Sequence, residues 1–184
     1  IAKDPIVVVS NVENGANNLS VDQLTGIFTG KITNWGAVGG ADLPINVAYI
    51  NTELESGSLL LFKEFTVGLN GELMSGAKTL DAPERLGNYV SRTPGGVTFM
   101  PLNSYMNNHG SILAINGVLP SNHSIEDGSY QLAATYYLTV RSEKNQAVDD
   151  FIAYCMSDEG QQVIARNFVP YSKSVSYTHL RAHE

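Results

Sequence analysis

Ser56, Gly57 and Ser58 are the residues of this sequence whose types and spacing best suit ligand chemistry. A strand is expected at residues 45–50, and the apolar-rich segment after Ser58 predicts a helix. Backbone N–H groups and hydroxyls at a helix N-terminus favour phosphate or sulfate, because that end holds the positive pole of the helix dipole. Gly57 would let the backbone approach such a ligand closely. The alternative, which spacing alone favours, is that Ser56 or Ser58 is an ordinary N-cap.

The remaining reactive side chains do not form a second constellation. His109 and His123 are lone histidines in polar, turn-rich stretches, which favours surface loops over metal ligands. Cys155 is the single cysteine and is expected to be a small core residue on an apolar helix face. The sequence contains no Ser-His-Asp arrangement, no phosphate-binding P-loop and no metalloprotease motif. We therefore expect no enzymatic activity, no cofactor and no metal.

Composition limits the class of protein. The chain has 184 residues, of which 43% are hydrophobic and 16% charged, so it can bury the core of one ordinary domain. No long uncharged apolar run is present, and we expect no membrane span. A net charge of -7 argues against a groove for nucleic acid.

The elements that must position Ser56–Ser58 follow from periodicity and capping signals. The apolar run Ile6–Val9 predicts a strand covered on both faces. Ser20 and Gln23 form a capping box for a helix that ends at Gly30. Further expected elements are a helix capped by Asp81, strands at 97–102, 111–115 and 131–140, and helices at 145–156 and 158–165. Strands that alternate with helices predict an α/β fold with a mostly parallel sheet.

A set of sequence blocks extends from residue 1 to about residue 171: Ile1–Val9, Leu24–Trp35, Ser56–Ser58, Thr93–Val97, Leu113–Val118, Ala147–Ile152 and Ser157–Gln161. In this order, the blocks resemble those of the phosphate-binding protein of bacterial phosphate ABC importers. The most specific block is Ile27–Trp35. Two roles are open for Trp35: an aromatic side chain at the rim of the ligand site, or a structural residue after the first helix. The block that contains Trp35 suggests the structural role.

The resemblance implies a type II periplasmic-binding-protein-like fold, with two α/β lobes joined by crossover strands and one lobe incomplete. Such lobes close on a small anion, here phosphate or a related oxyanion, which Ser56, Gly57 and Ser58 would contact. The implied partners are that anion and the membrane subunits of an ABC importer, with no nucleic acid. The implied location is periplasmic or extracellular, and a lipid anchor on a missing N-terminal segment is left open.

The expected organisation assigns residues 1–174 to the binding-protein-like region. Residues of about 11–97 would form the more complete lobe, and residues 1–10 and about 98–174 the crossover strands and part of the other lobe. We expect an N-terminal truncation, because the sequence opens inside a buried strand and the family has a preceding segment. Residues 175–184 back-translate to a string that looks like a sequencing adapter and are interpreted as a non-native tail. A native polar tail is the alternative.

The sequence departs from the family next to its candidate site. Thr52 and Leu59 occupy positions where the family usually has Arg, and Glu55 replaces a usual Gly. Arg makes bidentate, charge-assisted contacts with phosphate, each worth about 1.5–3 kcal/mol. Glu55 would repel a dianion if it pointed inward. A second hypothesis is therefore a binding-protein-like domain that has lost anion binding and serves in adhesion, signalling or assembly.

Two further expectations concern apolar side chains. Tyr136 and Tyr137 are expected to pack against the sheet rather than to stack on a ligand. The face formed by Val148, Phe151, Ile152 and Met156 is expected to stay partly exposed, because the lobe beneath it would lack its N-terminal strands.

Overall fold

The computed structural model describes residues 1–50, 57–105, 110–140 and 145–171. Within them, the strands are β1 (Ala2–Ser10), β2 (Asn18–Leu19), β3 (Asn46–Ile50), β4 (Lys78–Leu80), β5 (Gly96–Pro101), β6 (Ser111–Ile112), β7 (Ala114–Ile115), β8 (Ala133–Tyr136) and β9 (Val169–Pro170). The α-helices are α1 (Val21–Phe28), α2 (Gly57–Thr66), α3 (Pro83–Arg92), α4 (Asn122–Glu126), α5 (Gln146–Cys155) and α6 (Asp158–Ile164). Three 3-10 helices are η1 (Val12–Asn14), η2 (Trp35–Val38) and η3 (Leu102–Ser104).

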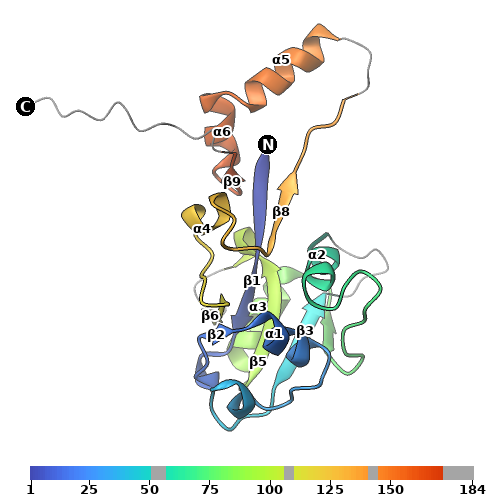
Figure 1. Ribbon diagram of the computed structural model, residues 1–184, viewed down its shortest axis with the longest axis vertical. Helices are drawn as coiled ribbons and strands as arrows, with labels where there is room; N and C mark the ends of the chain where they lie inside the picture. The colour runs from blue at the N-terminus through green and yellow to red at the C-terminus, as the bar shows by residue number, and fades with distance from the viewer. Residues whose placement is uncertain (51–56, 106–109, 141–144, 172–184) are drawn as a thin grey trace, which may run out of the picture.

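The long strand β1 organises the main sheet, whose order is β4-β3-β5-β1-β6 (Figure 1). Ile6–Ser10 of β1 pair with β5, while Ala2–Pro5 pair with β8, so one strand passes through two groups of strands. β1 is antiparallel to β5, β6, β8 and β9, whereas β3 is parallel to β4 and β5. The expectation of an α/β fold is confirmed, but that of a mostly parallel sheet is wrong because β1 runs against every strand it pairs with.

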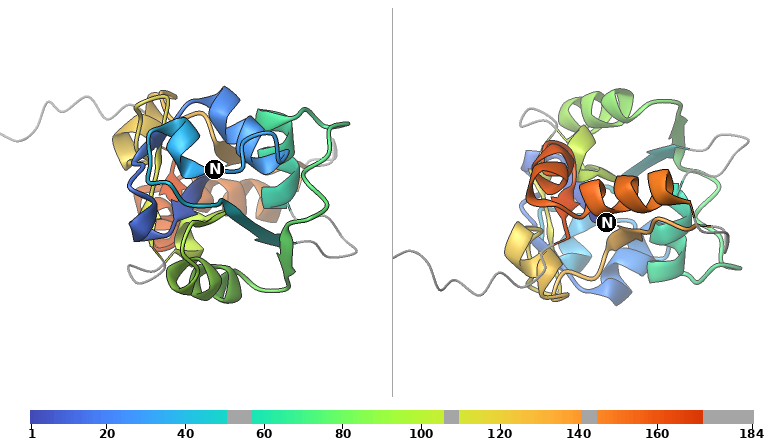
Figure 2. Two further views of the ribbon diagram at one scale, coloured as in Figure 1. Left: turned by 90° about the horizontal axis from the view of Figure 1, so that it is seen from below. Right: turned by 90° about the horizontal axis from the view of Figure 1, so that it is seen from above.

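Helices cover both faces of the sheet around β3 and β5, with α1 and α2 on one face and α3 on the other (Figure 2). Successive side chains of β1 point to opposite faces of the sheet, and each face has a hydrophobic core cluster. Ile6 and Val8 belong to the larger cluster, and Val7 and Val9 belong to the smaller one. This is the two-sided burial that the apolar run predicted. The larger cluster takes side chains from both sides of the predicted boundary near residue 97, and that boundary stays a prediction.

Two predicted helix starts had different outcomes. The capping box of α1 is confirmed: the Gln23 N–H donates to Ser20 Oγ (3.1 Å) and the Ser20 N–H donates to Gln23 Oε1 (2.9 Å). The predicted Asp81 cap of α3 is wrong. Ala82 is the N-cap residue without a side-chain hydrogen bond, and Asp81 instead forms an ion pair with Arg85 at 3.1 Å.

Trp35 has the structural role that its sequence block suggested. Its side chain is fully buried, and its indole Nε1–H donates to the Gly95 carbonyl at 2.9 Å. Gly95 has a φ of +71°, and a Cβ there would collide with the Pro44 carbonyl oxygen, so only glycine suits the position. This bond ties the segment after α1 to the turn before β5.

The part of the chain from β8 to α6 buries much less. The strand predicted at 131–140 is shorter, because β8 ends at Tyr136. Tyr137 is largely exposed, so the expectation that it packs against the sheet is wrong. Tyr136 is partly exposed, but its ring contacts Phe168 and its hydroxyl bonds Asp4 of β1. Helix α5 contains no buried residue; Val148 and Phe151 are exposed, as expected, while Cys155 is only partly buried rather than in a core. The reason is that, within the part of the chain that the structure describes, α5 packs mainly against α6.

Candidate functional site

The predicted anion-binding segment lies at the start of α2. The helix begins at Gly57 with Ser58 as its second residue, so Ser58 is not the N-cap. Ser56, Thr52 and Glu55 lie outside the described residues. The first N–H groups of an α-helix have no acceptor within the helix, which leaves those of Gly57 and Ser58 able to donate to a ligand.

A cavity of about 380 Å³ faces this helix start. It is enclosed by residues from β1, α2, the β5–η3 segment, β8 and the approach to β9. The lining residues are Asp4, Ile6, Gly57, Ser58, Pro101, Asn103, Ala134, Tyr136 and Phe168. The cavity therefore lies where β1 passes from its pairing with β5 to its pairing with β8.

Asp4 and Tyr136 form the most constrained polar pair of the cavity wall. The Tyr136 hydroxyl donates to Asp4 Oδ2 at 3.1 Å. In the β1–β8 register Tyr136 lies opposite Ala2 and Asp4 opposite Ala134, so this bond joins diagonal neighbours. Burial raises the pKa of the Asp4 carboxyl, and the hydrogen bond from Tyr136 partly opposes that shift. Burial, followed by the nearby Asp4 charge, also raises the pKa of Tyr136. The Tyr136 ring meets Phe168 edge-on, with centroids 5.6 Å apart.

The charge of this cavity does not suit a dianion. Among the described residues that line it, Asp4 is acidic and none is Lys or Arg. Leu59, at a position where the resembling family usually has Arg, is buried in the larger core cluster. Within the described lining, the hydrogen-bond donors that an oxyanion could use are all neutral. They are the Ser58 hydroxyl, the helix N–H groups and the Asn103 amide.

Sequence reasoning found part of this site and missed the rest. Gly57 and Ser58 line the cavity, and the prediction that they contact an anion stays a prediction. Asp4, Asn103 and Tyr136 were not selected, because what brings them to α2 is the non-local pairing of β1 with β8. No short motif encodes that pairing. Gly57 has no heavy atom within 4 Å of the position of a Cβ, so neighbouring protein atoms do not require glycine there.

Other candidate residues have surface roles or lie elsewhere. His123 is exposed on α4, as expected, and its Nε2 lies 3.4 Å from Asp127. His109 lies outside the described residues. In the described ranges, no group of three or more His, Cys, Asp or Glu side chains is placed to hold a metal ion. No helix found there has both the length and the apolar character needed to cross a lipid bilayer.

Comparison with known families defines the class of protein. Residues 1–159 match the model of the family described as a PBP superfamily domain. The chain belongs to this superfamily of periplasmic-binding-protein domains, which confirms the resemblance found in the sequence blocks.

Individual relatives show which proteins of known name the sequence is similar to. The chain is 26% identical over 162 residues to the phosphate-binding protein PstS of Bacillus subtilis, an alignment that covers 87% of this chain and 53% of that relative. It is 25% identical over 173 residues to PstS of Borreliella burgdorferi, covering 89% of this chain and 61% of the relative. The chain thus spans a little over half the length of these curated relatives.

Solved structures show the same fold. An ABC-type phosphate transport receptor from Vibrio cholerae superposes with a TM-score of 0.78 at 24% identity, covering 90% of this chain and 68% of that one. PstS from Borrelia burgdorferi gives a TM-score of 0.75 at 21% identity, covering 93% and 70%. At these identities the comparison establishes the type II binding-protein fold.

Proposed function

We propose that this chain is part of the substrate-binding component of an ABC importer and binds phosphate or a related small oxyanion by lobe closure. The names of its relatives, phosphate-binding protein and phosphate transport receptor, support the ligand class. The observation that favours it most is the cavity of about 380 Å³ in front of Gly57 and Ser58, at the crossover of β1. A binding protein of this kind acts outside the cytoplasm and delivers its ligand to membrane subunits.

The described residues suggest how the ligand would be held. The N–H groups of Gly57 and Ser58 and the Ser58 hydroxyl would donate to the oxyanion from α2. Asn103 would donate from the other side of the cavity, where η3 begins. Asp4 would keep the net charge of the bound ligand low, because a carboxylate near a dianion is unfavourable. We therefore expect a preference for the singly charged form of the oxyanion.

The proposal is tested by titrating the purified chain with inorganic phosphate, followed by calorimetry and by ¹H–¹⁵N NMR. We expect saturable shifts of the Gly57 and Ser58 amides, and at least tenfold weaker binding in Ser58→Ala. Ser91→Ala is the matched control, since its Oγ donates to the Asn88 carbonyl on α3 and does not line the cavity. Absence of heat and of shifts at millimolar phosphate would contradict the proposal.

A second candidate is a binding-protein-like domain that has lost anion binding and serves in adhesion, signalling or assembly. It is favoured by Thr52, Glu55 and Leu59 in the sequence and by a cavity lining that contains Asp4 but no described basic side chain. On this hypothesis, Thr52→Arg should create phosphate binding where the unaltered chain shows none. Tight binding by the unaltered chain rejects it.

A further inference from the structure

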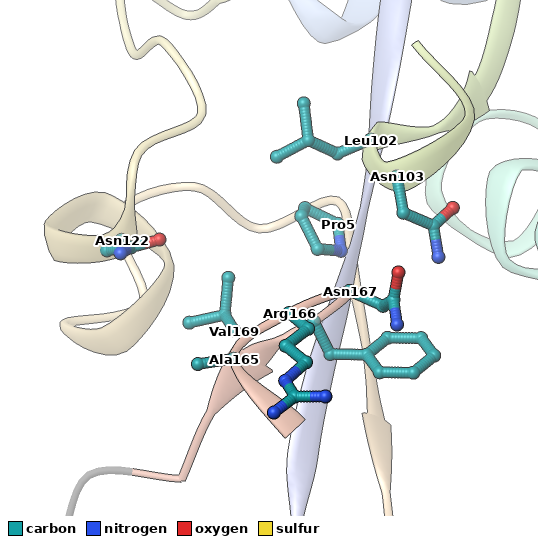
Figure 3. Close-up of a pocket in the computed structure, with 9 residues that line it drawn as sticks. Pro5, Leu102, Asn103, Asn122, Ala165, Arg166, Asn167 and Val169 are labelled. Atoms are coloured by element: carbon teal, nitrogen blue, oxygen red, sulfur yellow. The ribbon is translucent and has the colours of Figure 1, made fainter. Parts of the chain in front are cut away.

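A second hollow, of about 230 Å³, lies beside Pro5 of β1 and has a lining different in kind (Figure 3). Its polar residues come from three separate segments: Asn103 from η3, Asn122 from α4, and Arg166 with Asn167 from the turn between α6 and β9. In Figure 3, Asn122 and Asn103 lie on opposite sides of Pro5. Gly57 and Ser58 do not line this hollow. It shares only the lining residues Asn103 and Phe168 with the cavity of about 380 Å³ at the start of α2, which we call the oxyanion cavity.

The polar groups around this hollow have unused hydrogen-bonding capacity. Within the part of the chain that the structure describes, the Arg166 guanidinium and the side-chain amides of Asn122 and Asn167 have no hydrogen-bond or ion-pair partner in the protein. Asn103 Oδ1 accepts a bond from Ser104 Oγ at 3.3 Å, which leaves its NH₂ group available. A guanidinium and three amides thus line one hollow from different sides, and the fold leaves their N–H donors unused.

The charge of the hollow is that of a single cation. Arg166 is the charged residue of its described lining, and no carboxylate belongs to that lining, although the chain has a net charge of -7. A guanidinium presents a planar fork that matches a carboxylate with two parallel hydrogen bonds. One fixed positive charge balances one negative charge, so a monoanion suits the hollow better than a dianion.

The floor of the hollow is apolar. Pro5 and Val169 are buried, and Leu102 and Phe168 are half-buried. This surface favours a ligand with a carbon skeleton over a bare inorganic ion. The volume lies below the roughly 300–1,000 Å³ typical of pockets for drug-sized ligands, so the ligand must be small.

We propose that this hollow is a second binding site, separate from the oxyanion cavity, and that its ligand is a small organic monocarboxylate. Arg166 pairs with the carboxylate, Asn122 bonds a hydroxyl or keto oxygen of the ligand, and the carbon skeleton rests on Pro5 and Val169. The site does not depend on the proposed oxyanion binding, because different side chains supply its charge and its donors.

The test is a titration of the purified full chain with lactate, which has one carboxylate, one hydroxyl and one methyl group, followed by ¹H–¹⁵N NMR. We expect saturable shifts at Arg166 and Asn167 and at the Asn122 side-chain amide, with binding at least several-fold tighter than for acetate or inorganic phosphate. Arg166→Gln should weaken lactate binding at least tenfold. The matched control is Arg92→Gln, which removes the same charge from an exposed Arg at the end of α3.

Three outcomes would overturn the proposal. One is the absence of saturable shifts at up to about 50 mM lactate, well above a Kd of ~1 mM. Another is a loss of lactate affinity in Arg92→Gln equal to that in Arg166→Gln, which would indicate that net charge alone attracts lactate. The third is weaker lactate binding in Ser58→Ala with unchanged lactate binding in Arg166→Gln, which would place lactate in the oxyanion cavity. Should Arg166→Gln fail to give a native NMR spectrum, Asn122→Ala, on an exposed helix start, is expected to weaken lactate binding several-fold, and unchanged affinity would count against the site.

Discussion

Helices α1 and α5 have the same sequence signal, an N-cap residue followed by an apolar stripe, yet their surroundings differ. In α1, the side chains of Leu24, Ile27 and Phe28 are fully buried in the larger core cluster. In α5, no residue is buried, and Phe151 is 58% exposed. The same amphipathic pattern therefore predicts the helix in both cases but its burial in only one.

The difference teaches what amphipathicity encodes. An apolar stripe defines which face of a helix can be covered, whereas the covering surface comes from other segments of the chain. For α1 that surface is the sheet around β3 and β5; α5 packs mainly against α6. Elements with few buried contacts open locally at low free energy, so we expect α5 and α6 to be the least stable part of the described chain.

The largest expected effect comes from making the same substitution in both regions. Phe62→Ala removes a fully buried ring whose centroid lies 3.9 Å from that of Phe99 and 4.6 Å from that of Phe28. It should lower the free energy of unfolding by about 3–5 kcal/mol, through lost burial and the cavity left behind. Phe151→Ala should change it by no more than about 0.5 kcal/mol. Urea denaturation of the two variants measures the difference, and similar losses would show that α5 is packed into a core as α2 is.

A smaller effect is expected at a buried hydroxyl. Tyr130 is buried, and its Oη donates to the Ile6 carbonyl at 2.7 Å, while burial raises its pKa. Tyr130→Phe leaves that carbonyl without its partner and should destabilise the chain by about 1–3 kcal/mol. Tyr137→Phe, at a side chain that is 77% exposed, should leave the midpoint of urea unfolding unchanged. A neutral Tyr130→Phe would mean that water replaces the hydroxyl.

The third contrast concerns two N-caps of the same type. Ser20 Oγ accepts from the Gln23 N–H at 3.1 Å, and Ser157 Oγ accepts from the Gly160 N–H at 3.2 Å. Ser20→Ala should lower global stability by about 1 kcal/mol, since α1 is part of the core. Ser157→Ala should mainly speed local amide hydrogen exchange in α6, with a smaller effect on global unfolding. The reverse pattern would place α6 in the cooperative core.

Local signals predicted much of the fold. The capping box of α1 and the two-sided burial of Ile6–Val9 each rest on a few neighbouring residues, and both predictions were confirmed. The partly exposed stripe of α5 was also as expected, but that expectation came from the family resemblance and not from a local signal. The Asp81 cap failed because α3 begins one residue later than predicted, with Ala82 as its N-cap residue, and the Asp81 carboxylate pairs with Arg85 instead. The expected parallel sheet failed because strand alternation does not reveal that β1 runs against its neighbours.

The candidate site shows the same limit. Gly57 and Ser58 could be found because a helix start is a local feature. Asp4 and Tyr136 are 132 positions apart and meet only through the β1–β8 register. Their contact is set by the pairing of distant strands, which a single sequence does not specify.

The smallest expected effect is a dependence of stability on pH at that contact. Burial raises the folded-state pKa of Asp4 above its ordinary value of 3.8, so the folded chain binds this proton more tightly than the unfolded chain does. Where the folded state holds more protons, stability decreases as pH rises. The free energy of unfolding should therefore fall as pH increases from about 3.8 through the raised pKa of Asp4 and stay lower above it.

Variants at both ends of the contact test this interpretation. Asp4→Asn should abolish the contribution of Asp4 to that fall and be more stable, relative to the unaltered chain, at neutral pH than at pH below 3.8. Tyr136→Phe removes the hydrogen bond that opposes the shift, so the pKa of Asp4 should rise further and the fall should extend to higher pH. Tyr137→Phe is the control, because the Tyr137 side chain is exposed and it is the Tyr136 hydroxyl that bonds Asp4, so this variant should leave the pH profile unchanged. Thermal unfolding measured across this pH range distinguishes these cases. An Asp4→Asn variant that loses stability uniformly at all pH values would show instead that the ionised carboxylate is needed to hold β1 against β8.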